Sequence, residues 1–202
     1  KAMLGPEKVK PTFISRTDAV GIANGLAWTS VGGEMLPIEV SIIPNGSGKV
    51  EITGSLGDVM KESAHLALTY ARVHAETYHI APDKFKNTDI HIHAPEGAVP
   101  KDGPSAGVTL TTALISALSE IPVRHDLAMT GEITLHGNVL PIGGLKEKSM
   151  AAFREGISTV LIPEANKPDL YEVDEEVKKA VKFIPVSDLS QVLKHALILP
   201  AA

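Results

Sequence analysis

The sequence contains no cysteine among its 202 residues. A chain without thiols has no disulfide, no cysteine nucleophile and no sulfur-ligated zinc site, and it suits any reducing compartment. Apolar runs are short as well, because none approaches the roughly 18 residues of a membrane-spanning helix. The N-terminal residues also lack the charged-then-apolar order of a signal peptide. We therefore expect no membrane partner for this chain.

Concentrated positive charge is missing too. The formal net charge is -5, and no block of lysine and arginine forms the electrostatic footprint of a nucleic-acid-binding protein. The phosphate-binding pattern G-x-x-x-x-G-K-[ST] is absent, and GSGK at residues 46–49 is too short to replace it. These absences disfavour nucleic-acid binding and predict no nucleotide cofactor in this chain.

Apolar residues make up 44% of the chain, which is enough for a substantial core. Strand-like runs mix with helix-like runs, so the predicted class is α+β, or mixed α/β. Alternation predicts strands at 19–30, 34–44, 49–53, 89–95, 127–140 around a turn at 136–138, 159–163 and 183–186. Helical spacing predicts helices at 57–79, 105–119, 145–155, 166–181 and 187–197.

One short stretch, PKDGPSAG at residues 100–107, delivers Ser105 to the start of a very apolar helix. Free backbone N–H groups at a helix start would stabilise an oxyanion, which suits a serine nucleophile. The same pattern fits a helix in which Asp102 or Ser105 is only the N-cap. Local pattern favours the cap and leaves the nucleophile open.

A serine nucleophile needs a base, and two histidines lie two positions apart on one predicted strand. His91 and His93 would share one face of the sheet, as a base or, with Asp89 or Glu96, as metal ligands. Their spacing matches no recognised metal motif. A polar sheet face, or support beside an active site, is the preferred interpretation, and we expect no metal site.

The alternative base is a lysine whose amine is neutral because it has lost its hydration. Lys146 and Lys148 both flank the apolar stripe of the predicted helix at 145–155, so periodicity does not choose between them. Either one also fits a solvated surface lysine whose stem alone is buried.

Several separated motifs together closely resemble the proteolytic domain of the Lon family, ATP-dependent serine proteases with a Ser/Lys dyad (peptidase family S16). The resemblance runs from about residue 20 to 198 and depends on PKDGPSAG, MTGEITLHGNVLPIGGLKEK from Met129, GLAWTSVGGE from Gly25 and TGSLGDVMKES from Thr53. It implies that Ser105 is the nucleophile and that Lys148, not Lys146, is the general base.

The resemblance assigns supporting roles to further residues. Thr130 and Glu132 in MTGEIT match residues that line the site, with the threonine orienting the lysine amine. Asp102 matches an acidic residue that shapes the nucleophile loop or closes an inactive form. Trp28 matches a segment that borders the substrate cleft, although a core aromatic remains the alternative. His91 and His93 become scaffolding next to the site.

The resemblance also implies a fold and partners. The expected fold is the two-layer ribosomal-protein-S5-domain-2-like fold over residues 19–198, preceded by a linker at 1–18 and followed by a tail at 199–202. The linker would lead from an AAA+ ATPase module, outside this sequence, that holds ATP and Mg²⁺. Expected partners are unfolded or damaged proteins and identical subunits in a hexameric ring, with DNA bound only through regions outside this chain.

The resemblance places such an enzyme in protein quality control and the stress response, in the bacterial cytoplasm rather than the mitochondrial matrix. A non-proteolytic Lon-like domain that assembles or binds nucleic acid is the first alternative, and the intact Ser/Lys pair argues against it. A small-molecule kinase relative is the second, and the missing phosphate loop argues against it.

Overall fold

The computed structural model describes residues 14–95 and 101–201. Its main sheet contains β1 (Ile22–Thr29), β2 (Gly32–Pro44), β3 (Val50–Thr53), β4 (Thr88–His93), β5 (Leu127–Met129), β8 (Thr159–Pro163) and β9 (Lys182–Val186). A separate hairpin pairs β6 (Glu132–Ile133) with β7 (Val139–Leu140). The α-helices are α1 (Asp58–Val73), α2 (Gly107–Ser119), α3 (Leu145–Arg154), α4 (Glu175–Ala180) and α5 (Leu189–Ala196). Short 3₁₀ segments are η1 (Pro82–Phe85), η2 (Pro104–Ala106) and η3 (Glu164–Glu172).

The main sheet is mixed, which confirms the predicted class. Its strand order is β3-β4-β2-β1-β5-β8-β9. The predicted hairpin of β1 and β2 is antiparallel, whereas β1, β5, β8 and β9 run parallel to one another. Parallel neighbours end at the same edge of a sheet, so the carboxyl ends of β1 and β5 lie close together.

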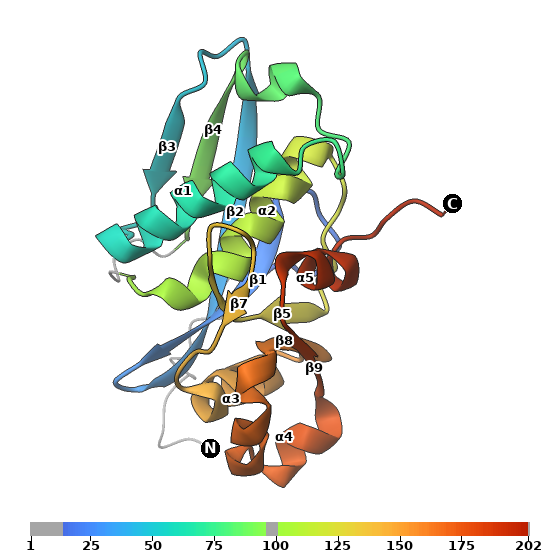
Figure 1. Ribbon diagram of the computed structural model, residues 1–202. Coiled ribbons are helices and arrows are strands. Elements are labelled where there is room, and N and C mark those ends of the chain that lie inside the picture. Colours follow the sequence, from blue (N-terminus) through green and yellow to red (C-terminus); the bar gives the residue numbers. More distant parts are fainter. Residues whose placement is uncertain (1–13, 96–100, 202) are drawn as a thin grey trace, which may run out of the picture.

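Two hydrophobic clusters occupy opposite faces of this sheet. Helices α1, α2 and α5 contribute to the larger cluster, and α3 and α4 to the smaller one. Neighbouring strand residues divide between the two, as Met129 and Ala128 of β5 do. Over β3 and β4 the expected two layers hold, and over β5, β8 and β9 the helices α3 and α4 add a third (Figure 1).

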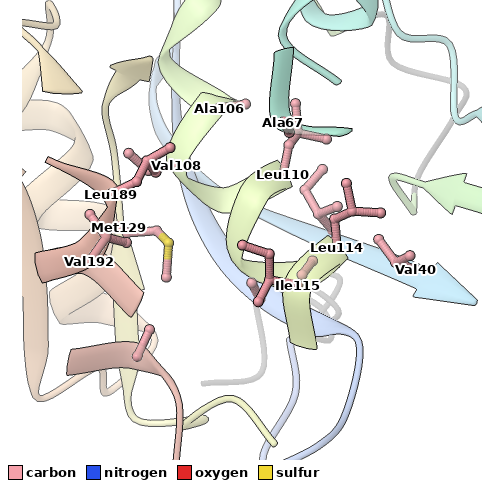
Figure 2. Close-up of a cluster of buried hydrophobic side chains, with 14 of the residues drawn as sticks. Val40, Ala67, Ala106, Val108, Leu110, Leu114, Ile115, Met129, Leu189 and Val192 are labelled. Carbon is pink, nitrogen blue, oxygen red and sulfur yellow. The ribbon is translucent and has the colours of Figure 1, made fainter. Parts of the chain in front are cut away.

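Helix α2 lies at the centre of the larger cluster, where every residue from Gly107 to Leu118 is buried. Figure 2 shows its Leu110, Leu114 and Ile115 among side chains from β2, α1, β5 and α5. The hydroxyls of Thr111 and Thr112 donate to carbonyls one turn earlier, so they need no outside partner. The prediction that so apolar a helix is buried is confirmed.

Three predicted helices differ in extent from the real ones. The helix predicted to reach His79 ends at Val73, and the chain turns until His79, whose φ is +55°. The helix predicted from Ser105 begins at Gly107, because η2 forms a tighter turn first. The helix predicted over 166–181 is interrupted by extended backbone at Val173 and continues as the short α4.

The linker predicted for residues 1–18 falls partly outside the described residues, which begin at Ile14. Ile14 is buried in the smaller cluster, and Arg16 and Asp18 bond to the body of the domain. Contacts of the domain therefore begin before the boundary predicted at residue 19. Within residues 14–95 and 101–201, no helix combines the length and apolarity needed to span a membrane.

Candidate active site

One cavity of about 400 Å³ opens where four segments of the chain meet. Trp28 at the carboxyl end of β1, Ser105 in η2 and Lys148 in the first turn of α3 all line it. Thr130 follows the carboxyl end of β5 and is hydrogen-bonded to Lys148. The crevice outside the carboxyl ends of parallel strands is the usual place for ligands in open α/β sheets.

Ser105 lies in a turn whose backbone requires a glycine at one position. Gly103, two residues earlier, has φ 126° and ψ 157°, a region that residues with a side chain almost never adopt. The Ser105 carbonyl accepts from Gly131 N at 2.9 Å, and Gly131 O accepts from Val108 N at 3.1 Å. The nucleophile turn is therefore tied to the residue next to Thr130.

Neither Asp102 nor Ser105 is the N-cap of α2. The capping position is Ala106, whose side chain makes no capping bond. Asp102 Oδ1 instead accepts from Met60 N at 3.1 Å, in the first turn of α1, and from Gly103 N at 2.9 Å. Asp102 thus caps a helix distant in sequence, and this contact fixes the start of the nucleophile turn on α1.

Lys148 is buried, with only 2% of its surface exposed. Its Nζ donates to Thr130 Oγ1 at 3.2 Å, and Thr130 is buried as well. Loss of hydration lowers the pKa of Lys148 from 10.5 to about 8. Lys146 is exposed and lines a second, smaller pocket. The structure thus distinguishes the two lysines that periodicity left equivalent, because Lys148 is buried and Lys146 is exposed.

Two glycines allow α3 to approach the β1–β2 hairpin closely enough to bury Lys148. A methyl group on Gly33 of β2 would lie 1.9 Å from the carbonyl oxygen of Glu147. A methyl group on Gly144, the N-cap of α3, would lie 2.7 Å from Cγ of Trp28. Gly144 also has φ +70°, which favours glycine.

We expect Gly33→Ala to displace the first turn of α3, because the added methyl cannot share space with backbone. A displacement of about 1 Å at a catalytic group costs roughly 10²-fold in rate. Peptide hydrolysis and the melting temperature should fall together. Gly143→Ala is the matched control for stability, since its methyl meets no atom within 4 Å. An unchanged rate in Gly33→Ala would contradict this account of how Lys148 is placed.

Trp28 is 58% exposed and lines the cavity, so it is not a core aromatic. The cavity walls include apolar residues that sequence patterns did not single out, namely Ala27, Met35, Leu36, Pro37, Met60 and Ile142. Asn166 was also missed. It is buried, and its amide accepts from Ile142 N at 2.9 Å and donates to Ile142 O at 2.8 Å, which holds the cavity wall ahead of α3.

Three predicted supporting residues lie elsewhere. Glu132 belongs to β6, opposite Leu140, and is not among the residues that line the cavity. His91 Nε2 and His93 Nδ1 both hydrogen-bond Thr53 Oγ1, at 2.8 and 2.7 Å, which joins β4 to β3 outside the cavity.

The metal alternative for these histidines gains no support from their neighbours. Asp89 Oδ1 accepts from Ser47 N and Lys49 N in the adjacent turn, and Glu96 lies outside the described residues. Across residues 14–95 and 101–201, no three His, Asp or Glu side chains are grouped to hold a metal ion.

The arrangement agrees with comparisons to known proteins. The model of the Lon protease (S16) C-terminal proteolytic domain matches residues 1–199. The chain belongs to the Lon protease family. It is 55% identical over 196 residues to Lon protease 1 of Myxococcus xanthus, covering 97% of this chain and 24% of that protein.

Other members of the family are equally similar. The chain is 57% identical over 196 residues to Lon protease of Bacillus thuringiensis, covering 97% of this chain and 25% of that protein. With Lon protease of Chloroflexus aggregans it shares 55% over 195 residues, which is 96% of this chain and 23% of that protein. The chain thus spans about a quarter of the length of these curated relatives and matches the C-terminal proteolytic domain of the family.

Proposed function

We propose that this Lon-family domain hydrolyses peptide bonds with Ser105 as nucleophile and Lys148 as general base. The burial of Lys148 in the cavity that Ser105 also lines carries the proposal. With a pKa of about 8, roughly a tenth of the Lys148 amine is neutral at pH 7, against roughly one part in three thousand for an ordinary lysine. Only the neutral amine accepts the serine proton.

The proposed reaction has two stages. Ser105 Oγ attacks the scissile carbonyl carbon while Lys148 Nζ takes the hydroxyl proton, and Lys148 then gives this proton to the leaving amine as the C–N bond breaks. The product is an ester between Ser105 and the acyl part of the substrate. Water attacks this ester while Lys148 takes its proton, and the proton returns to Ser105 Oγ as the acid leaves.

Two features of the site support this chemistry. The N–H of Ser105 lies in the first turn of η2, where a helix leaves backbone donors without an internal acceptor. We infer that it binds the oxyanion. The Thr130 hydroxyl fixes the direction of the Lys148 amine. Asp102 anchors the loop, and Trp28 borders the substrate.

The substrates and partners we propose follow from the relatives, which are about four times longer than the chain. Unfolded or damaged proteins are the proposed substrates, delivered by an AAA+ ATPase module outside this chain that holds ATP and Mg²⁺. A hexameric ring, DNA contacts through other regions only, and a role in bacterial cytoplasmic protein quality control complete the proposal.

The test is the rate of cleavage of an unstructured protein, without ATP, from about pH 6 to about pH 10. We expect the rate to rise through about pH 8 and then level off, because deprotonation of Lys148 activates Ser105. A rate that is flat across this range, or that falls as pH rises through 8, would contradict Lys148 as the base.

The same assay separates this chain from a self-sufficient protease. Folded protein should survive intact, because the chain has no phosphate loop to bind the nucleotide that drives unfolding. Degradation of a stably folded protein by this chain alone would overturn the proposed dependence on an ATPase module.

A further inference from the structure

Residues 14–18 make contacts on the two elements that carry Lys148 and Thr130. Ile14 is 6% exposed and belongs to the buried cluster that includes Leu145 and Ala152, both on α3. The segment therefore contributes to the same apolar cluster as the buried face of α3, the helix that carries Lys148.

Arg16 holds the far end of the same helix. Its Nη1 donates to Glu155 O at 2.8 Å, and its Nη2 contacts Glu155 Oε2 at 3.1 Å. Glu155 is the C-cap of α3, where a carbonyl has no partner inside the helix and a cation is favoured by the helix dipole. The guanidinium supplies both the hydrogen bond and the charge.

Asp18 holds the second element. Its Oδ1 accepts from His125 N at 3.0 Å and contacts His125 Nδ1 at 2.6 Å. His125 lies two residues before the short strand β5, and the next residue after β5 is Thr130. The contacts with His125 hold the pKa of Asp18 below its usual value, so this carboxylate is charged at neutral pH.

The Lys148–Thr130 hydrogen bond joins these two elements. Lys148 is on α3 and Thr130 follows β5, so the 3.2 Å bond between them depends on their separation. We propose that residues 14–18 form a brace, positioning α3 and β5 so that the Lys148 amine meets the Thr130 hydroxyl. This inference rests on the proposed function, because it assigns Arg16 and Asp18 a positioning role for the proposed base.

The brace has a consequence for a longer protein. The family model describes a C-terminal domain, so in such a protein the chain before residue 14 leads to the rest of the molecule. A force on that part of the chain would displace Ile14 and Arg16 first, and through them α3 and Lys148. The brace would then transmit the state of an upstream module to the base, without any contact with substrate.

The experiment compares Arg16→Ala, Asp18→Ala and the double variant with the unaltered chain. The altered side chains are exposed, Arg16 by 64% and Asp18 by 44%, so the fold should survive and melting curves will check it. We expect the rate at neutral pH to fall by roughly tenfold in the double variant, because the amine loses the hydroxyl that orients it. The rising limb should stay near pH 8 or move slightly lower, because the Thr130 hydroxyl accepts from the charged amine and so favours the charged form. The value of kcat should fall while KM stays the same, because the walls that contact substrate are untouched.

Three comparisons distinguish positioning from general weakening. Arg16→Lys should restore part of the rate, since one of the two contacts survives. Arg72→Ala, which removes an arginine from the last turn of α1, should keep the original profile. In a Thr130→Val background, Arg16→Ala should have little further effect, because the contact it serves is already gone.

The brace is wrong if the unaltered chain shows the limb near pH 8 and the double variant keeps the same kcat. Equal additional loss in the Thr130→Val background would also overturn it. The proposed function fails separately, if the unaltered chain shows no such limb or if Ser105→Ala retains its activity.

Discussion

Lys148→Met is expected to stabilise the protein at neutral pH while it abolishes peptide hydrolysis. Burial lowers the pKa of Lys148 from 10.5 to about 8, and each pKa unit corresponds to about 1.4 kcal/mol, so the buried charge costs about 3 kcal/mol at pH 7. Methionine has a similar length and no charge. The Thr130 hydroxyl loses its partner, which costs about 1 kcal/mol. The net gain is therefore about 2 kcal/mol, or roughly 4–8 °C in melting temperature.

The pH dependence of this gain follows from the direction of the pKa shift. Below about pH 8 the amine is charged in both the folded and the unfolded chain, so the cost of burial is present in full. Between about 8 and 10.5 the folded state releases its proton while the unfolded state keeps it, and stability rises with pH. Lys148→Met should lack this rise, so its advantage should disappear near pH 10.5.

The matched control is Lys146→Met, because Lys146 is exposed two residues earlier on the same helix. Denaturant unfolding at pH 7 and at about pH 10 measures both variants. A Lys148→Met protein that is less stable than the original at pH 7, with Lys146→Met unchanged, would mean that the buried amine is not the desolvated group described here.

Ser105→Ala is expected to reduce peptide hydrolysis by about 10⁴-fold or more, because removal of the nucleophile leaves only binding and oxyanion stabilisation. Its stability and the alkaline rise of that stability should stay the same, since Lys148 and Thr130 keep their bond. The rate at which the sample cleaves an unstructured protein tests the loss of activity. The unfolding curve of the same sample tests the unchanged stability.

Ser119→Ala is the control for loss of a hydroxyl from this helix. Ser119 ends α2 and donates to Ile115 O, far along the helix from the cavity. It should keep the original rate. If Ser105→Ala also kept it, another group would be the nucleophile and the proposed mechanism would be wrong.

Sequence patterns predicted most of the fold because they follow burial. The strict alternation of β4, the apolar length of α2 and the Ser187–Asp188 helix start all have local causes, and Asp188 does accept from Gln191 N. The extent of α1 was wrong because helical spacing continues past Val73 in sequence, while the backbone turns there. Local periodicity cannot detect a turn that contains no glycine or proline.

The candidate site was harder to predict, because its properties come from packing between distant elements. Lys146 and Lys148 flank the same stripe, and only the contact of Gly33 with α3 shows which one is buried. The cap of α2 that local pattern assigned to Asp102 or Ser105 was wrong for the same reason, because the Asp102 acceptor atom serves α1, more than forty positions earlier in sequence. Neighbouring residues of one motif also differ in position, since Thr130 contacts Lys148 while Glu132 of β6 pairs with Leu140 of β7.

The central claim is that the buried lysine, rather than its exposed neighbour, serves Ser105. The most direct test measures cleavage of an unstructured protein at about pH 8 by Lys148→Met and Lys146→Met, both shown by their unfolding curves to be folded. We predict no detectable cleavage by Lys148→Met and the original rate for Lys146→Met. Cleavage that survives in Lys148→Met and is lost in Lys146→Met would contradict the account.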